Sequence, residues 1–303
     1  MANPMQDLRI IYYHHIQPEP AGNSSAVSLN KFKWQIAFLR RKYEIISLSQ
    51  AIQLNQEGQS LKGKMCITFD DGFVSFYQHA LPVLKQYHLP ATVFLISSCV
   101  NNQQLMWRNK LDLISKQRSQ HLQNAILSLC ENYHLELPQN NLMQWSLNWP
   151  MAQKDDFCTF LWEYTRMPDI HQYLSDHPVY MNTDQIHDAM NQNIEFGSHT
   201  RSHPVCSKLT DVELSEEVED SLSELSILLN QTITLFSYPF GLRAAPELET
   251  CLINNQKVKS LLGIYYKKKH PNDPFHWERD NMEIPFVKSM LRFTPLLSLY
   301  LKK

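Results

Sequence analysis

Segments that favour strands alternate with segments that favour helices along most of this chain. Runs of β-branched and aromatic residues are typical of buried strands, and they occur at 10–16, 44–47, 64–69, 92–96, 194–197, 232–236 and within 258–266. Helical spacing separates several of these runs, at 31–43, 76–87, 183–192 and after 210. A repeated order of strand, helix and strand is the signature of parallel α/β units. The sequence therefore predicts an α/β fold built around a parallel sheet.

The alternation stops between residues 101 and 182. This region is rich in Asn, Gln, Leu and Trp, and it has helical spacing without a convincing strand. We therefore expect one domain that carries a mostly helical insertion at 101–182, a size that fits 303 residues. The remaining parts of the domain are then 9–100 and 183–285, and a C-terminal helix is predicted at 286–303.

Composition narrows the class of protein. A formal net charge of −2 gives no electrostatic reason to expect nucleic-acid binding. The six cysteines form no C-x-x-C pair, which favours free thiols. Residues 1–10 lack the basic and apolar regions of a secretory signal, and no apolar stretch approaches the roughly 20 residues that span a bilayer. These features predict a soluble, cytoplasmic protein, and they leave its oligomeric state open.

Two adjacent carboxylates, Asp70 and Asp71, follow the predicted strand at 64–69. The ends of buried parallel strands are where α/β folds collect their active sites. Two neighbouring acids repel each other, so one is best held ionised by a cation while the other accepts a proton. The alternative is a plain Asp-Gly turn, in which the short polar side chains satisfy only the backbone.

A pair of histidines, His199 and His203, follows the predicted strand at 194–197. Neutral imidazole is a common nitrogen ligand for zinc, and Pro204 argues that the pair lies on a loop and not on a regular helix. The alternative is two surface or capping histidines. Together with the two acids, the pair would supply the ligands and the base for metal-assisted hydrolysis, with Zn²⁺ as the expected ion.

Two further segments offer groups for proton transfer and for binding an oxyanion. His14 and His15 follow the first predicted strand, and one of them is a candidate general acid. Their alternative is a strand end without a special role. The stretch 238–241, Tyr-Pro-Phe-Gly, can offer a backbone N–H to an oxyanion, or it can be an ordinary turn that contains proline.

Three motifs in this order, TFDDGF, GSHTRSHP and SYPFG, make the chain resemble the polysaccharide deacetylases, the NodB-homology group of carbohydrate esterase family four. The resemblance covers roughly residues 9–100 and 183–285. It implies an irregular (β/α) barrel of about seven strands. It also implies an enzyme that uses a divalent metal to remove an acyl group, usually acetyl, from the nitrogen of an amino sugar.

The resemblance assigns roles to individual residues. Asp71 is similar to the metal-binding carboxylate of the family, with His199 and His203 as its imidazole partners. Asp70 matches the general base. Phe240 matches the residue whose backbone N–H helps to stabilise the tetrahedral oxyanion.

The chain departs from the family pattern at two places. Ser237 stands where many members have an arginine that orients the base, and whether Arg279 replaces it in space is left open. No histidine follows Arg279, although the family's general acid is usually a histidine near the C-terminus. Tyr13-His14 is similar to the acid segment of a permuted subgroup, so His14 is the predicted acid, with His15 as the alternative.

The leading functional prediction is a cytoplasmic, metal-dependent N-deacetylase that acts on an amino sugar of a cell-surface polysaccharide precursor. The alternative is a non-catalytic barrel that binds carbohydrate or serves as a scaffold. Trp107, Arg108 and Trp145 are candidates for a wall of the substrate site, with ordinary helical packing as their alternative. Residues 286–303 could associate with a membrane surface, although packing against the barrel is favoured.

Overall fold

A ring of parallel strands forms the centre of the fold in this computed structural model, which describes residues 8–19, 26–116, 120–264 and 275–284. The strands follow the order β10-β9-β8-β7-β6-β5-β1-β11, with β4 beside β5, and each pairing in this sheet is parallel. Their bounds are β1 Arg9–Tyr13, β4 Glu44–Ile45, β5 Lys64–Phe69, β6 Ala91–Leu95, β7 Ile194–Ser198, β8 Leu235–Ser237, β9 Ser260–Gly263, β10 His276–Glu278 and β11 Asp280–Asn281. A separate two-stranded sheet pairs β2 Ile16–Gln17 with β3 Val27–Ser28.

One extended segment closes the ring. Only Arg279 separates β10, which pairs with β9, from β11, which pairs with β1. The backbone N–H of Arg279 donates to the carbonyl of Gly263 at 3.2 Å, and the N–H of Met282 donates to the carbonyl of Tyr12 at 3.3 Å. The same stretch of chain therefore joins both ends of the strand order, which contains eight strands in the described part of the chain, slightly more than the predicted seven. The predicted (β/α) barrel is confirmed.

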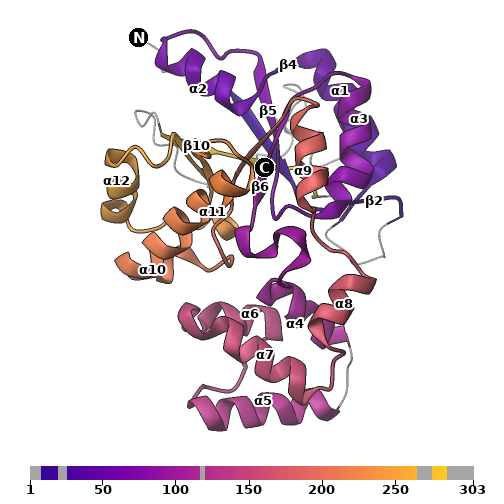
Figure 1. The fold of residues 1–303 in the computed structure, drawn as a ribbon, viewed down its shortest axis with the longest axis vertical. Helices are drawn as coiled ribbons and strands as arrows, with labels where there is room; N and C mark the ends of the chain where they lie inside the picture. Colours follow the sequence, from indigo (N-terminus) through magenta and orange to yellow (C-terminus); the bar gives the residue numbers. More distant parts are fainter. Residues whose placement is uncertain (1–7, 20–25, 117–119, 265–274, 285–303) are drawn as a thin grey trace, which may run out of the picture.

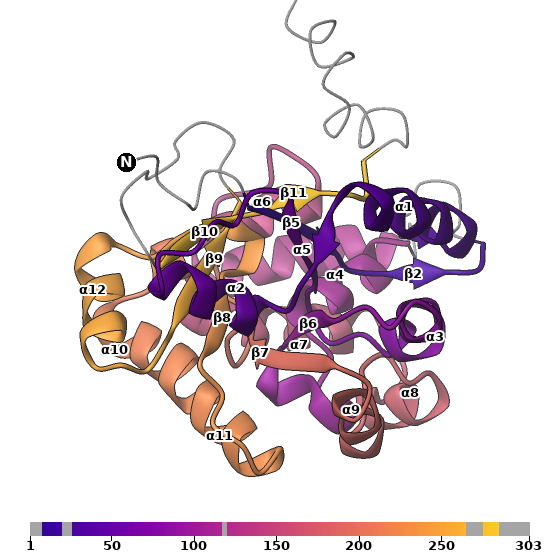
Figure 2. The same cartoon turned by 90° about the horizontal axis from the view of Figure 1, so that it is seen from above.

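Helices cover the outside of the ring, as the view from above shows (Figure 2). They bury apolar faces against the β-branched and aromatic residues of the strands, which form the main core. Their bounds are α1 Leu29–Lys42, α3 Leu81–Gln86, α9 Thr183–Met190, α10 Asp211–Ser215, α11 Ser221–Leu228 and α12 Pro246–Asn254. A further helix, α2 Leu48–Gln56, packs in a separate cluster with strand residues such as Ile10 and Phe94. Local sequence fixes several of their ends. Asn182 with Gln185 and Thr210 with Glu213 form capping boxes at the starts of α9 and α10.

The predicted helical insertion forms a lobe of its own beneath the barrel in Figure 1. Its helices are α4 Trp107–Lys116, α5 Gln120–Tyr133, α6 Leu142–Trp145, α7 Lys154–Tyr164 and α8 Ile170–Asp176. They enclose a second apolar cluster, in which Trp107, Trp149 and Phe157 are almost completely buried. An isolated bridge between Phe73 and Tyr180 connects the base of the lobe to the barrel.

Several local predictions from the sequence were wrong at their boundaries. The strand predicted at 10–16 ends at Tyr13, and β2 begins at Ile16 on the other side of the two histidines. By contrast, the helix predicted at 76–87 is present at nearly these bounds, as a π-helical turn, Phe76–Ala80, followed by α3, which has Pro82 in its first turn, where a missing N–H is tolerated. The strand predicted at 232–236 is shorter and later, at Leu235–Ser237.

Other elements were missed or lie outside the described residues. The sequence analysis did not predict α2, α12, β10 or β11. The C-terminal helix predicted at 286–303 lies outside the described residues, and so does any contact it makes. Within the described part of the chain, no helix is long and apolar enough to cross a bilayer.

Candidate active site

The candidate residues meet at one end of the barrel because parallel strands all point the same way. His14 follows β1, Asp70 and Asp71 follow β5, and His199 follows β7. Backbone hydrogen bonds hold these strand ends in register. The N–H of Asp70 donates to the carbonyl of Tyr13 at 2.9 Å, and the N–H of His199 donates to the carbonyl of Leu95 at 2.8 Å.

Asp71, His199 and His203 form a buried cluster with the chemistry of a metal site. Asp71 Oδ1 lies 3.3 Å from Nε2 of His203 and 3.5 Å from Nε2 of His199. One ligand atom from each of the three lies within 4.8 Å of the others, and all three side chains are buried. One carboxylate and two imidazoles form a donor set that suits a divalent ion such as zinc.

The hydrogen bonds around His199 favour a cation in the centre of this cluster. Nδ1 of His199 lies 2.7 Å from the carbonyl oxygen of Ser237, an acceptor only, so Nδ1 carries the proton. Nε2 then presents a lone pair towards Asp71, whose Oδ1 is buried and accepts no hydrogen bond within the described part of the chain. The lone pairs of His199 Nε2 and Asp71 Oδ1 therefore face each other. A metal ion between these two atoms would satisfy both, so the donor set fits a metal ion.

The ionisation states agree with this interpretation. Burial raises the pKa of Asp71, but the neighbouring imidazoles of His203, His14 and His199 outweigh it and hold that pKa well below its usual range. Burial lowers the pKa of His199 to about 4, despite the nearby carboxylates. At neutral pH the cluster therefore offers a carboxylate and a neutral imidazole, the forms that bind a metal.

The backbone is strained where it presents these ligands. Asp71, Thr200 and His203 have φ angles of 70°, 68° and 60°, a region that residues other than glycine rarely adopt. The N–H of His203 donates to Oγ1 of Thr200 at 2.9 Å, which turns the chain sharply between the two histidines. Such conformations persist only where the surroundings hold them, and they cluster at functional sites.

Asp70 is held by an arginine from the segment that closes the barrel. Nη1 and Nη2 of Arg279 donate to the two carboxylate oxygens of Asp70 at 2.7 and 2.8 Å, and Nη1 also lies 3.3 Å from Oγ1 of Thr68. Burial raises the pKa of Asp70, but Arg279 outweighs it and keeps the pKa below its ordinary value. Arg279 therefore binds the predicted base, Asp70, in place of an arginine at position 237. The carbonyl oxygen of Ser237 instead accepts a hydrogen bond from His199.

His14 lies between Asp70 and a second carboxylate, Glu283. Its Nδ1 is 3.0 Å from Oε2 of Glu283, its backbone N–H donates to Oε1 at 2.6 Å, and its Nε2 is 4.0 Å from Asp70 Oδ2. Burial lowers the pKa of His14, but Glu283 more than reverses this and raises it to about 10. His15 instead stacks on Phe73 with ring centroids 3.6 Å apart, and burial lowers its pKa to about 4.

Phe240 lies three positions after the end of β8 in a tight turn, with a φ of 58°. Its ring contacts that of His203, with centroids 4.7 Å apart, and Cζ of Arg108 lies 5.0 Å from the centre of the Phe240 ring. This contact brings the third motif to the histidine pair. Arg108 is the member of the predicted substrate wall that remains half-exposed.

The two tryptophans of that predicted wall are packing residues instead. Trp107 is fully buried, and its indole N–H donates to the carbonyl of His203 at 2.8 Å. Trp145 is 7% exposed, and its indole N–H donates to the carbonyl of Glu136 within the insertion. Neither ring is free to stack on a sugar, so the structure favours the packing alternative.

Sequence reasoning missed Glu283 and Thr68, which orient His14 and Arg279. The structure shows why this region was missed. Buried Trp277 and Arg279 alternate with more exposed Glu278 and Asp280, as in a strand, but three of these four residues are charged, so the residue types do not show the alternation. No local pattern distinguishes Glu283 from a surface acid.

The fold and the cluster define a barrel protein with a buried carboxylate–dihistidine centre. Beside this centre lie a carboxylate bound by an arginine and a histidine bound by a second carboxylate. A family model described as polysaccharide deacetylase matches residues 57–125 and 163–250, just over half of the chain. This chain belongs to the polysaccharide deacetylase family, as its motifs predicted.

Characterised relatives are similar over part of the chain. A poly-beta-1,6-N-acetyl-D-glucosamine N-deacetylase of Staphylococcus epidermidis is 34% identical over 94 residues, which cover 31% of this chain and 32% of that protein. Its counterpart in Staphylococcus aureus is 33% identical over 92 residues, 30% of this chain and 31% of that protein. The chain therefore matches about a third of the length of these relatives.

Solved structures extend the similarity of fold to almost the whole chain. A Streptococcus pyogenes deacetylase, PplD, in complex with acetate superposes with a TM-score of 0.62 at 15% identity, over 94% of this chain and 96% of that one. IcaB from Ammonifex degensii superposes with a TM-score of 0.60 at 18% identity, over 91% of both chains. At these identities the match establishes the fold.

Proposed function

We propose that this protein is a metal-dependent hydrolase that removes an N-acetyl or similar acyl group from an amino sugar of a polysaccharide or its precursor. One observation carries the proposal. A buried carboxylate–dihistidine cluster lies beside a carboxylate that an arginine holds ionised and beside a histidine that a second carboxylate holds protonated. Hydrolysis of an amide needs a polarised carbonyl, a base and an acid, and this arrangement offers groups for all three.

Asp71, His199 and His203 would hold the metal, for which Zn²⁺ suits the donor set best. A bound divalent ion supplies Lewis acidity for the amide carbonyl and a lowered pKa for an attacking water. Asp70 would take the proton from the attacking water. Arg279 keeps Asp70 ionised and fixes the direction of its lone pairs through two parallel hydrogen bonds.

His14 acts at the other end of the reaction. Its Nδ1 is engaged by Glu283, so Nε2 is the nitrogen directed at the site and carries the proton that the departing amine requires. An amine is a poor leaving group unless it is protonated, so this step controls cleavage of the carbon–nitrogen bond. The backbone N–H of Phe240 donates to the carbonyl oxygen as negative charge develops there.

The substrate class is proposed from the family and from the names of the relatives. Two of them are N-deacetylases of poly-beta-1,6-N-acetyl-D-glucosamine, so a β-linked N-acetylglucosamine polymer or its precursor is the first substrate to test. A cytoplasmic location, and with it a lipid-linked or nucleotide-linked precursor, stays a prediction.

The direct test measures acetate released by the purified, zinc-loaded chain from oligomers of β-1,6-linked N-acetylglucosamine, with chitin oligomers as the comparison. We expect release by the native protein and none by Asp70→Asn, which should retain its metal. If the native protein binds zinc but releases no acyl group from amino sugars of either linkage, the hydrolase proposal fails. The barrel would then be assigned to carbohydrate binding.

A further inference from the structure

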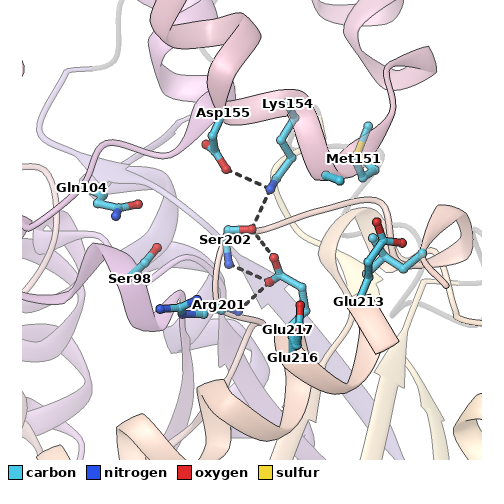
Figure 3. A pocket seen from close by; sticks show the side chains of 12 residues that line it. Ser98, Gln104, Met151, Lys154, Asp155, Arg201, Ser202, Glu213, Glu216 and Glu217 are labelled. Carbon is cyan, nitrogen blue, oxygen red and sulfur yellow. Dashed lines mark hydrogen bonds and ion pairs between the residues drawn. The ribbon is translucent and has the colours of Figure 1, made fainter. Parts of the chain in front are cut away.

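Residues outside the three sequence motifs bind the loop between His199 and His203. Figure 3 shows Ser202, one residue before His203, between a glutamate from the barrel side and a lysine from the helical lobe. These groups line a cavity of about 410 Å³ between the insertion and the barrel.

The side chain of Glu217 binds the backbone of this loop. Glu217 lies in the π-helical turn Glu216–Asp220 between α10 and α11. Its Oε2 accepts hydrogen bonds from the N–H groups of Arg201 at 3.0 Å and Ser202 at 2.8 Å, and its Oε1 accepts one from the Ser202 hydroxyl. A carboxylate that accepts successive backbone N–H groups fixes the course of the chain there. The loop contains two residues with positive φ, Thr200 and His203, so it needs such restraint.

Lys154 reaches the same serine from the insertion. It is the first residue of α7, it is only 4% exposed, and its Nζ donates to Ser202 Oγ at 2.7 Å and to Asp155 Oδ2 at 2.9 Å. Lysine is almost never this buried unless it is paired. The desolvation cost of the ammonium group is thus offset by one carboxylate and by the hydroxyl of the histidine loop.

Trp107, the first residue of α4, supplies a second connection. Its indole N–H donates to the carbonyl of His203 itself at 2.8 Å. The backbone of His203 is therefore fixed on both sides, by Thr200 at its N–H and by Trp107 at its carbonyl. The two contacts from the lobe come from different helices, and both end on the same short loop.

We infer that the helical lobe is part of the metal centre, with Lys154 and Trp107 acting as positioning residues that hold His203 in its metal-binding conformation. The inference rests on the proposed metal site, and it assigns to the insertion a role in metal affinity. Groups that orient ligands from outside the coordination shell typically change metal affinity or activity by about 10- to 100-fold when they are removed.

The test measures the affinity of the full-length protein for Zn²⁺ by competition with a chromophoric chelator at constant pH. Trp107→Phe removes the indole N–H and keeps an aromatic ring, and Lys154→Met removes the ammonium group and keeps the chain. We expect each to bind zinc roughly 10- to 100-fold more weakly than the native protein. The ligand-field absorption spectrum of bound Co²⁺ should shift in both variants, because the geometry at His203 changes.

The controls make the same chemical change away from the loop. Trp145→Phe removes an indole N–H that donates to the carbonyl of Glu136, and Lys116→Met breaks an exposed pair with Asp112. Both controls should bind zinc within about twofold of the native protein. The double variant Lys154→Met with Ser202→Ala should bind no more weakly than Ser202→Ala alone, since both changes act through one hydroxyl.

The outcomes separate this inference from the proposed function. If the native protein binds no zinc, the metal site and the inference both fail. If the native protein binds zinc and the two variants match their controls, the inference alone is overturned. Thermal unfolding of the metal-free variants identifies any loss of fold, and reduced affinity in a variant whose metal-free stability equals that of its control supports the positioning role.

Discussion

The two halves of the site differ in how completely their charges are paired by the protein itself. On the acid–base side, Asp70 is bound by Arg279 through two hydrogen bonds and His14 by Glu283 through another two. On the metal side, Asp71 Oδ1 is buried without a hydrogen bond in the described part of the chain, and imidazole nitrogens face it at 3.3 and 3.5 Å.

This difference indicates that the two halves obtain their geometry from different sources. The acid–base half is preorganised, because each charged group already has a partner of opposite charge. The metal half brings acceptors together at a cost that a cation would offset. Four predictions follow from this contrast, in order of decreasing effect.

Asp71→Asn should abolish both metal binding and acetate release, because it removes the only carboxylate of the cluster. The same change should remove stabilisation by zinc. The native protein should gain about 2.7 kcal/mol of unfolding free energy at a free zinc concentration 100 times the Kd, and the variant none. Metal analysis and thermal unfolding with and without zinc measure both effects. Stoichiometric zinc in the variant would contradict the assignment of Asp71.

His14→Gln should lower the rate of acetate release by about 10²- to 10⁴-fold, the usual contribution of a general acid. Zinc content should stay at the native level, because His14 lies beside Asp70 and outside the cluster. The matched control is His15→Gln, since His15 stacks on Phe73 and should matter far less. Equal losses in the two variants would remove the distinction between the two histidines.

Arg279→Met should destabilise the fold by about 3–5 kcal/mol, because it leaves the carboxylate of Asp70 buried without its partner. Arg279 keeps the pKa of Asp70 low, so this pair stabilises the protein above the ordinary pKa of aspartate and is lost as pH falls through the lowered one. In the variant the pKa of Asp70 rises, and the acid limb of the activity profile moves to higher pH.

Denaturant unfolding and pH–rate profiles test the prediction for Arg279. Arg9→Met is the control, because Arg9 in β1 forms an exposed pair with Asp280 in β11, the residue that follows Arg279. The control should change stability by no more than about 1 kcal/mol. An equal loss of stability in both variants would show that disturbance of the closing segment, and not the unpaired charge on Asp70, causes the loss.

Glu283→Gln should lower the rate of acetate release at neutral pH by less than His14→Gln does, and it should move the alkaline limb of the activity profile to lower pH. Glu283 raises the pKa of His14 to about 10 against the effect of burial, so the loss of Glu283 lowers that pKa. As pH rises, the activity of the variant therefore begins to fall at a lower pH than that of the native protein. The ion pair stabilises the fold fully below about pH 6.5, the ordinary pKa of histidine, and is lost as pH rises towards 10. Stability measured at pH 6 should therefore fall in the variant, and the deficit should shrink near pH 10. An unchanged alkaline limb would contradict the role of Glu283.

The metal half of the site was predictable from the sequence because its residues belong to compact motifs. Asp70 and Asp71 end a run of buried strand residues, and His199 and His203 lie four positions apart in one loop. In a parallel barrel, strand ends meet at one face, so a correct fold class was enough to bring these motifs together. Their roles as ligands and base remain predictions for the variants above to test.

The geometry of the acid–base half could not be predicted from the sequence, because it depends on contacts that no local pattern reveals. Arg279 reaches Asp70 across 209 residues of sequence, and Glu283 reaches His14 across 269. Both contacts require the closing segment to lie beside β1, and the sequence analysis did not predict a strand there. Trp107 was a candidate for the wall of the substrate site, with helical packing favoured, because exposure cannot be read from residue type, and its burial agrees with packing.

The closing segment has a consequence for the order in which the site becomes competent. The cluster residues and Asp70 are all synthesised before Ser260, but the arginine that holds the base comes last, between β10 and β11. A domain generally folds as a unit, and contacts between residues distant in sequence form late. A nascent chain that has not yet released the closing segment therefore lacks both the finished barrel and the partner of Asp70. Closure of the barrel would complete the proposed metal cluster and the proposed acid–base pair in one step.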